Sequence, residues 1–139
     1  MTPFDLAYMA GFFDGEGSAG ISRMRNPKGL SFGIEVSVTN TNKEIILFFK
    51  RHFGGRLATK GGTGKHKLAW QLHFTKDESK VILTSLLPFL RVKRRQAELV
   101  LEFIETCQHR NPHNRPTVNE QALREVIYEE VAELNKRGV

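Results

Sequence analysis

The sequence has almost no cysteine and no long apolar run. Its single cysteine, Cys107, allows no internal disulfide, so we expect a reducing compartment such as a bacterial or archaeal cytoplasm or the interior of an organelle. No apolar run approaches the roughly 20 residues of a membrane helix, and the N-terminus lacks the basic start and apolar stretch of a secretory signal. The five histidines have no metal-ligand spacing. These absences argue against a disulfide scaffold, a membrane span and a histidine metal centre.

The charge of the chain is unevenly distributed. The 139 residues carry a net charge of +6 and are 40% hydrophobic, which fits one globular domain over residues 1–139. Residues 1–16 contain three acids and no lysine or arginine. Residues 17–76 contain eleven basic residues and two acids, and residues 77–139 contain ten of each. Positive charge concentrated in one segment is typical of a nucleic-acid-binding surface, whereas a generic solvated surface does not predict this segregation.

Four segments carry helix-start signals, in which a threonine is followed three residues later by an acid. They are Thr2–Asp5, Thr41–Glu44, Thr75–Glu78 and Thr117–Glu120. Gly54 and Gly55 predict the end of the second helix. After residue 75, apolar residues recur at helical spacing in three stripes: Val81, Ile82, Leu86 and Leu87; Ala97, Val100, Leu101 and Ile104; and Leu123, Ile127, Val131 and Leu134.

Apolar and polar residues alternate in the segments between these helices. Residues 31–39 and 67–74 have a clear period of two, which predicts half-buried strands with one solvated face. Residues 18–25 alternate more loosely, with Ala19 and Ile21 as inward candidates, and residues 56–60 form a short strand. Turns or loops are expected at residues 26–29, 61–64 and 111–116. The predicted order of elements is α-β-β-α-β-β-α-α-α.

The first helix has small residues along one face. Ala7, Gly11 and Gly15 are four residues apart and therefore share a stripe. Because glycine costs roughly 1 kcal/mol relative to alanine inside a helix, the stripe suggests close approach of a second helix. Asp14 and Glu16 close the segment. A carboxylate at the end of such a helix pair would lie beside its symmetry mate, and two acids near a twofold axis suggest divalent-metal chemistry.

Two segments resemble a known family. Residues Met9–Gly17 resemble the nine-residue signature of the LAGLIDADG homing endonucleases, with Ala10, Gly11, Asp14 and Gly17 identical to the pattern. Pro88–Ala97 resembles a second segment of the single-motif members. The resemblance implies an α+β fold with an αββαββα core, a four-stranded antiparallel saddle that lies over DNA, and an extra C-terminal helix.

The resemblance also implies roles for individual residues. Glu16 and the backbone carbonyl of Gly15 would bind Mg²⁺, with Mn²⁺ as a substitute, Asn40 would position a water molecule, and Lys93 would organise water and stabilise charge. The alternative for Asn40, a plain strand-end residue, is nearly as well supported. The alternative for Lys93 is a solvated lysine in a basic run, and the match of the surrounding segment favours the catalytic role over it. A homodimer is implied, with an interface that includes Ala7, Ala10, Gly11, Asp14 and Gly15.

The polar strand faces are expected to read double-stranded DNA, because a β-ribbon fits the major groove. Basic residues there would contact bases or phosphates. The expected DNA-binding residues are Ser18, Ser22, Arg23, Arg25, Asn26, Ser31, Glu35, Ser37, Arg56, Lys60, Lys65, Lys67, Gln71 and His73. A twofold protein requires a palindromic or near-palindromic site.

The sequence therefore suggests an intron-encoded, site-specific homing endonuclease that makes a Mg²⁺-dependent staggered double-strand cut with 3′ overhangs. We expect no membrane partner and no small-molecule substrate. The alternative is a non-catalytic nucleic-acid binder of the same fold, such as an intron maturase or a transcription regulator, which needs neither Glu16 nor Lys93. A weaker third hypothesis is a small protein-interaction domain whose basic strands are incidental.

Overall fold

The structure is a computed structural model that describes residues 1–107 and 117–136. Its elements follow the predicted order, with one additional 3₁₀ turn, η1. They are α1 (Pro3–Glu16), β1 (Gly17–Asn26), β2 (Gly29–Asn40), α2 (Lys43–Phe53), β3 (Arg56–Lys60), β4 (Ala69–Phe74), α3 (Lys76–Leu86), η1 (Leu87–Phe89), α4 (Arg94–Thr106) and α5 (Val118–Leu134). The loop predicted at residues 111–116 lies outside the described residues.

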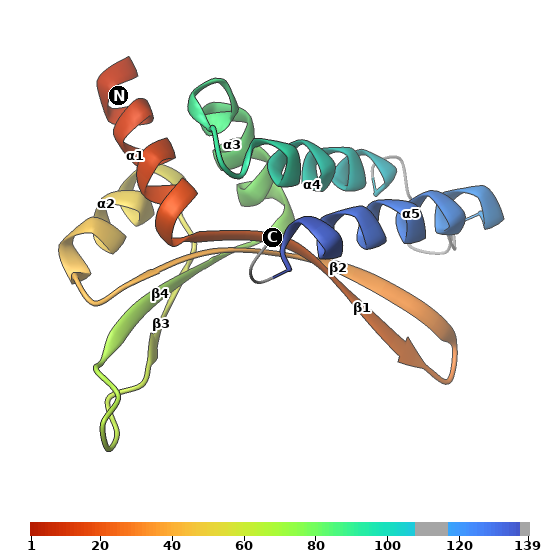
Figure 1. The fold of residues 1–139 in the computed structure, drawn as a ribbon, viewed down its shortest axis with the longest axis horizontal. Helices are drawn as coiled ribbons and strands as arrows, with labels where there is room; N and C mark the ends of the chain where they lie inside the picture. The colour runs from red at the N-terminus through yellow and green to blue at the C-terminus, as the bar shows by residue number, and fades with distance from the viewer. Residues whose placement is uncertain (108–116, 137–139) are drawn as a thin grey trace.

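The four strands form one antiparallel sheet in the order β1-β2-β4-β3. The sheet arches like a saddle, and the helices lie on its convex side while the concave side stays uncovered (Figure 1). The predicted α+β fold with a four-stranded antiparallel saddle is therefore confirmed.

The hydrophobic core lies between the helices and the convex face of the sheet. Its largest fully buried side chains come from the first helix, the second helix and the fourth, namely Phe13, Phe49 and Phe103. From the sheet, the inward residues of β1, β2 and β4 are Ala19, Ile21, Val36, Val38, Leu72 and Phe74. Burying each large apolar side chain contributes about 1.5–3 kcal/mol, so this layer holds the helices against the sheet. The side chains of the concave face are not part of this core.

Three of the four predicted helix caps are confirmed. The Thr2 and Thr75 side chains accept hydrogen bonds from Asp5 N and Glu78 N, and both segments form full capping boxes. Thr117 accepts from Glu120 N. The fourth cap was assigned one residue too early: Asn42, not Thr41, caps α2, because Asn42 Oδ1 accepts from Glu44 N at 2.9 Å.

The predicted apolar stripes are partly wrong. Val81 and Leu123 are 56% and 49% exposed, whereas Leu83, Leu99 and Phe103, outside the predicted stripes, are buried. The stripes missed these positions because both helices of the α3–α4 pair bury a wider face than the spacing alone suggests. Within residues 1–107 and 117–136, no helix is long and apolar enough to cross a membrane.

Helix α5 follows the outer half of β1 and β2 and secures the edge of the sheet (Figure 1). Near its C-terminal end, Asn135 Nδ2 donates to the Ala19 carbonyl of the edge strand β1 at 2.9 Å, and Gln121 Nε2 donates to Leu30 O at 3.2 Å. An unpaired strand edge is a site for unwanted pairing. The extra helix therefore covers an edge as well as part of the convex face.

Candidate nucleic-acid interface and active site

Strand register decides which side chains face the open side of the saddle. Directly paired residues of antiparallel strands share a face, and the inward face is fixed by buried Val36 and Val38. Ser18 pairs with Ser37, Ser37 with His73, and His73 with Arg56, so these residues form one row on the concave face. Ten of the predicted DNA-binding residues lie on this face: Ser18, Ser22, Asn26, Ser31, Glu35, Ser37, Arg56, Lys60, Gln71 and His73.

Two predicted readers lie on the opposite side of the sheet. Arg23 forms an ion pair with Glu125 of α5, and its guanidinium lies 4.4 Å from the centre of the Tyr128 ring. Arg25 shares the face of Arg23 because residues two apart on a strand point the same way. The assignment of both to the DNA face was wrong. The loose alternation of this segment gave no sign of the partner helix, which is about 100 residues later in the chain.

The concave face also contains residues that the sequence reasoning omitted. Gln71 of β4 pairs with Thr39 of β2 on one side and with Ala58 of β3 on the other, so the three residues form one row across the sheet. Met24 pairs with Ser31 and is 65% exposed. Continuing the alternation from Ser37 would have identified Thr39.

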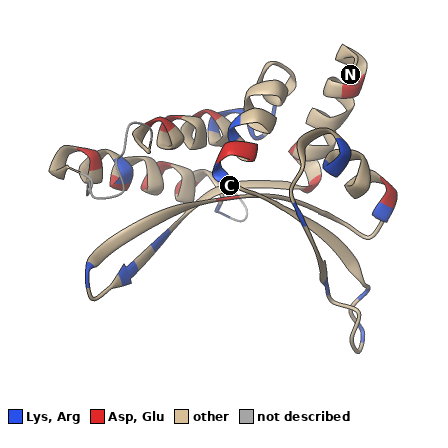
Figure 2. Cartoon of the chain, turned by 180° about the vertical axis from the view of Figure 1, so that it is seen from behind, with Lys and Arg blue, Asp and Glu red and all other residues tan. Residues whose placement is uncertain are grey.

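The positive charge of this side comes from the strand ends and the β3–β4 loop. Lys65 and Lys67 lie in that loop and are exposed, while Arg56 and Lys60 begin and end β3. In Figure 2 the acidic residues gather on the helices, and basic residues mark the strands and the tips of the two hairpins. This distribution suits a polyanion lying along the concave face.

Glu16 lies where α1 meets the saddle. It is the last residue of α1, it is exposed, and it borders a hollow on the concave face together with Thr39, Gln71 and His73. The next residue must be glycine, because a Cβ at Gly17 would lie 2.5 Å from Phe13 Cδ2. The chain can therefore turn directly from α1 into β1, which places Glu16 at the centre of the arch.

Lys93 contacts the end of the same helix. Its Nζ donates to Asp14 O at 2.8 Å and to Phe13 O at 3.4 Å. Both carbonyls lie in the last turn of α1, where Phe13 O also accepts from the backbone N–H of Gly17. Burial lowers the pKa of Lys93 below its usual value, and the nearby charges of Asp14 and Glu16 oppose this shift. Lys93 and Glu16 therefore lie near the same end of α1, and the catalytic roles expected of them stay predictions.

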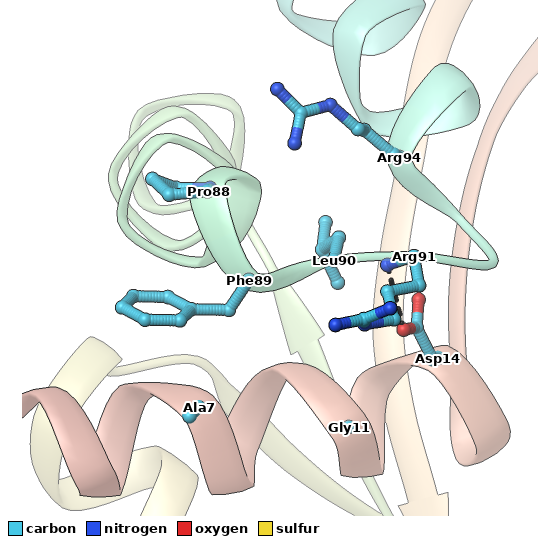
Figure 3. Close-up of a pocket in the computed structure, with 8 residues that line it drawn as sticks. All are labelled: Ala7, Gly11, Asp14, Pro88, Phe89, Leu90, Arg91 and Arg94. Atoms are coloured by element: carbon cyan, nitrogen blue, oxygen red, sulfur yellow. Dashed lines mark hydrogen bonds between the residues drawn. The ribbon is translucent and has the colours of Figure 1, made fainter.

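Asp14 is bound within its own chain. Its two carboxylate oxygens accept from Arg91 N and Lys93 N, both at 2.9 Å, and Figure 3 shows the bond to Arg91. Lys93 is the N-cap of α4 and makes no side-chain cap hydrogen bond, and the bonds to Asp14 hold the backbone just before the helix begins. This Asp14 clamp, the pair of bonds to Arg91 N and Lys93 N, holds α4 against α1.

Asn40 lies away from Glu16. It pairs with Trp70, on the helix-facing side of the sheet, and its Oδ1 accepts from Asn42 N at 2.8 Å. The hollow at Glu16 is bordered by other residues of β2, among them Glu35, Ser37 and Thr39, and not by Asn40. The proposed water-positioning role of Asn40 stays a prediction.

The small-residue stripe of α1 is bare. A Cβ added at Gly11 or Gly15 would meet no atom within 4 Å, and Ala7 is exposed. A shallow hollow runs beside the stripe, with Phe89 above Ala7 and Arg91 near Gly11 (Figure 3). Ala10, in contrast, is fully buried in its own core, so its assignment to the dimer interface was wrong.

Two exposed aromatic residues extend this bare face. Phe4 is 86% exposed and Tyr8 is 60% exposed. Exposed aromatic side chains beside glycine on one helix are typical of a surface that another chain covers.

The architecture has clear counterparts among solved structures. The archaeal intron-encoded homing endonuclease I-Vdi141I, complexed with DNA, superposes with a TM-score of 0.79 at 22% identity, over 98% of this chain and 87% of that chain. The homing endonuclease I-CvuI, in complex with the I-CreI target, gives 0.77 at 20% identity, over 98% and 85%. This chain has the LAGLIDADG homing endonuclease fold. No protein-family model matches the sequence, and no curated protein sequence matches it.

The LAGLIDADG fold also occurs in longer proteins. The LAGLIDADG homing endonuclease I-GzeII, in complex with its DNA target, has a TM-score of 0.62 at 15% identity, over 95% of this chain but only 44% of that one. This chain therefore corresponds to less than half of such a protein.

A divalent metal in this fold would have few protein ligands here. Among the described residues, no three His, Cys, Asp or Glu side chains lie close enough to hold an ion. Glu16 borders an open hollow, and its carboxylate and the carbonyl of the preceding residue, Gly15, are hard oxygen donors. Mg²⁺ commonly binds one or two carboxylates, keeps several waters and takes further oxygens from a substrate phosphate. The residues present fit that pattern.

Proposed function

We propose that this protein is a homodimeric, site-specific endonuclease that cuts double-stranded DNA in a Mg²⁺-dependent reaction. The observation that carries the proposal is the position of Glu16, exposed at the centre of a polar saddle with basic ends. The same helix that presents Glu16 has a bare glycine stripe on its other side. Helix α1 would therefore contribute both the catalytic carboxylate and the surface through which two copies of the chain pair over the DNA. The proteins of this fold named above were solved with DNA, which supports a DNA substrate.

The saddle would bind DNA along its concave face. Polar side chains such as Ser37 and Gln71 would approach base edges in the major groove, and Lys65 and Lys67 would contact phosphates. Release of counterions from several phosphates makes affinity fall steeply with salt.

The bare stripe supports a twofold pairing through α1. Contact between two copies of Ala7 and Gly11 would bring two helix ends together, so that two Glu16 side chains stand near one axis. The proteins of about twice this length with the same fold support a working unit that contains two such saddles. A twofold unit requires a palindromic or near-palindromic site, and each half would cut one strand, giving staggered 3′ ends.

Residues of this chain would divide the chemistry. Glu16 and the Gly15 carbonyl would hold Mg²⁺, which when bound acts as a Lewis acid on the phosphate and activates water. Lys93, kept in place by Phe13 O and Asp14 O, presents an ammonium group that stabilises charge near the scissile phosphate. Asn40 would assist only if its side chain left the Asn42 N–H.

The test uses a target selected from a randomised palindromic DNA library. Purified protein is incubated with that duplex in Mg²⁺ and, in parallel, in EDTA. We expect cleavage of both strands in Mg²⁺ alone, and we expect Glu16→Gln to abolish cleavage while specific binding stays nearly unchanged. Cleavage that survives EDTA, or equal loss of binding and cleavage in the variant, would contradict the metal-ligand role.

A non-catalytic nucleic-acid binder is the second candidate. The hydrogen bond from Asn42 N to Asn40 favours it, because it turns the expected water-positioning side chain away from Glu16. This candidate predicts specific binding with no cleavage in Mg²⁺ or Mn²⁺, and a binding affinity that is unchanged by Glu16→Gln and Lys93→Met. The same incubations therefore separate the two functions.

A further inference from the structure

Glu35 is the one acid on the strands' concave face within residues 1–107 and 117–136. The other charged residues of that face are basic, namely Arg56 and Lys60. Glu35 is exposed and takes part in no hydrogen bond or ion pair in the described part of the chain. A carboxylate here opposes the binding of phosphates, so its presence needs a specific reason.

The neighbours of Glu35 leave its side chain room to project. Its direct partner on β1 is Gly20, and Gly33 lies two residues away on the same face of β2. Ser37, on the other side, is small. The Glu35 carboxylate therefore stands above a stretch of low surface on the saddle floor, where base edges rather than phosphates would lie.

An ionised carboxylate can only accept hydrogen bonds. In the major groove, cytosine presents the N4 donor without an acceptor of its own, while adenine presents a donor beside the N7 acceptor. Guanine presents two acceptors and thymine presents one with a methyl group. Cytosine is thus the best partner for Glu35, and guanine is the worst.

We propose that Glu35 is a specificity-determining residue that selects cytosine at one position in each half of the DNA site and rejects guanine there. The proposal rests on the proposed function and adds a base preference to it. Thr39 borders the same hollow as Glu16. The distance along β2 from Thr39 to Glu35 is about 13 Å. Because base pairs rise 3.4 Å, the selected position lies at most about four base pairs outward from the cut.

The test selects cleaved sites from a randomised inverted-repeat DNA library with the wild type, Glu35→Gln and Glu35→Arg. We expect the wild type to prefer cytosine over guanine at one symmetric position by at least about tenfold. Glu35→Gln should lose that preference and accept adenine, which glutamine can bind at N6 and N7. Glu35→Arg should reverse the preference to guanine. All other positions should keep their preferences.

Glu129→Gln is the matched control, because it removes one negative charge at an exposed position of α5. It should leave the base preference at every position of the site unchanged. An incidental carboxylate would behave differently: Glu35→Gln would raise affinity for all sequences equally and leave every position's preference intact. That outcome, or loss of preference at many positions, overturns the proposal. A wild type that selects no site at all would instead reject the proposed function, and the base preference with it.

Discussion

Arg23 and Arg56 carry the same group on opposite faces of one sheet. Arg23 pairs with Glu125 and lies over Tyr128, whereas Arg56 begins β3 in the row that contains His73. Only the second arginine is in a position to contact DNA. The alternation of the sequence could not separate the two, because arginine is polar enough for either face and its aliphatic part packs well against an aromatic ring.

The two arginines provide a matched test of the concave face. Arg56→Ala should weaken DNA binding several-fold and reduce the slope of log affinity against log salt by about one. Arg23→Ala should leave affinity and slope unchanged, and should lower the free energy of unfolding by about 1 kcal/mol through loss of the ion pair and ring contact. Anisotropy titrations at several salt concentrations and urea unfolding provide both readings. Equal effects on binding would contradict the assigned faces.

At the scale of single residues, the sequence identified candidate catalytic residues but not the contacts that their side chains make. Glu16 and Lys93 were predicted from motif positions, and the structure brings them to the same helix end. The neighbourhood of Asn40 could not be predicted, because a one-residue shift at a strand end moves a side chain to the other face. The same uncertainty of one residue separated Thr41 from the true cap, Asn42.

At the scale of elements, the Asp14 clamp joins α1 to α4. Asp14→Asn should leave one of the two backbone N–H groups without its acceptor, which costs about 1–3 kcal/mol of stability. Because the clamp places Lys93, we expect the single-turnover cleavage rate to fall at least tenfold while DNA affinity changes little. Asp5→Asn is the control, since the Asp5 carboxylate accepts two hydrogen bonds, from Thr2 N and Thr2 Oγ1, at the far end of α1. An equal loss of rate in both variants would show a general effect of helix stability.

Glu78 ties the start of α3 to the end of α2. Its two carboxylate oxygens accept from Thr75 N and Gly55 N, both at 3.0 Å, and these bonds lower the pKa of Glu78 from 4.5. A carboxylate with a lowered folded-state pKa stabilises the protein above its unfolded pKa, and this contribution is lost as pH falls through the folded pKa.

Glu78→Gln should therefore reduce the free energy of unfolding by about 1–2 kcal/mol at pH 7, and by progressively less below pH 4.5. Urea unfolding from pH 7 to pH 3 measures this difference, with Glu129→Gln as a control for the loss of a charge. A difference that grows as the pH falls would contradict the role of these bonds.

Elements were the most predictable level of this protein. Threonine caps and alternating apolar residues set the order and approximate ends of helices and strands. Which helix faces are buried was less predictable, because the burial of Leu83 and Leu99 depends on how α3 and α4 pack on α1 and β1. Sequence periodicity indicates which face of a helix is apolar. It does not indicate that a second element of the fold buries another face of the same helix.

At the scale of the whole molecule, the bare stripe of α1 has a clear consequence. Gly11→Leu meets no atom of its own chain within 4 Å of the new Cβ, so the fold of one copy should persist and gain some helix propensity. Between two copies the new side chain would keep the helices apart. Sedimentation velocity should show a shift from dimer to monomer, and cleavage should be lost. Ala132→Leu, at an exposed position of α5, should change neither, and normal association of the first variant would contradict pairing through the stripe.

The most direct test of the central claim is a mixed dimer. Wild-type and Glu16→Gln chains with different affinity tags are expressed together, the mixed species is isolated, and it is incubated in Mg²⁺ with supercoiled plasmid that carries the selected site. If two copies pair through α1 and each Glu16 serves one strand, the mixed dimer should nick the plasmid to open circles while the wild-type dimer makes linear DNA. Linear product from the mixed dimer, or no cleavage by the wild-type dimer, would contradict the claim.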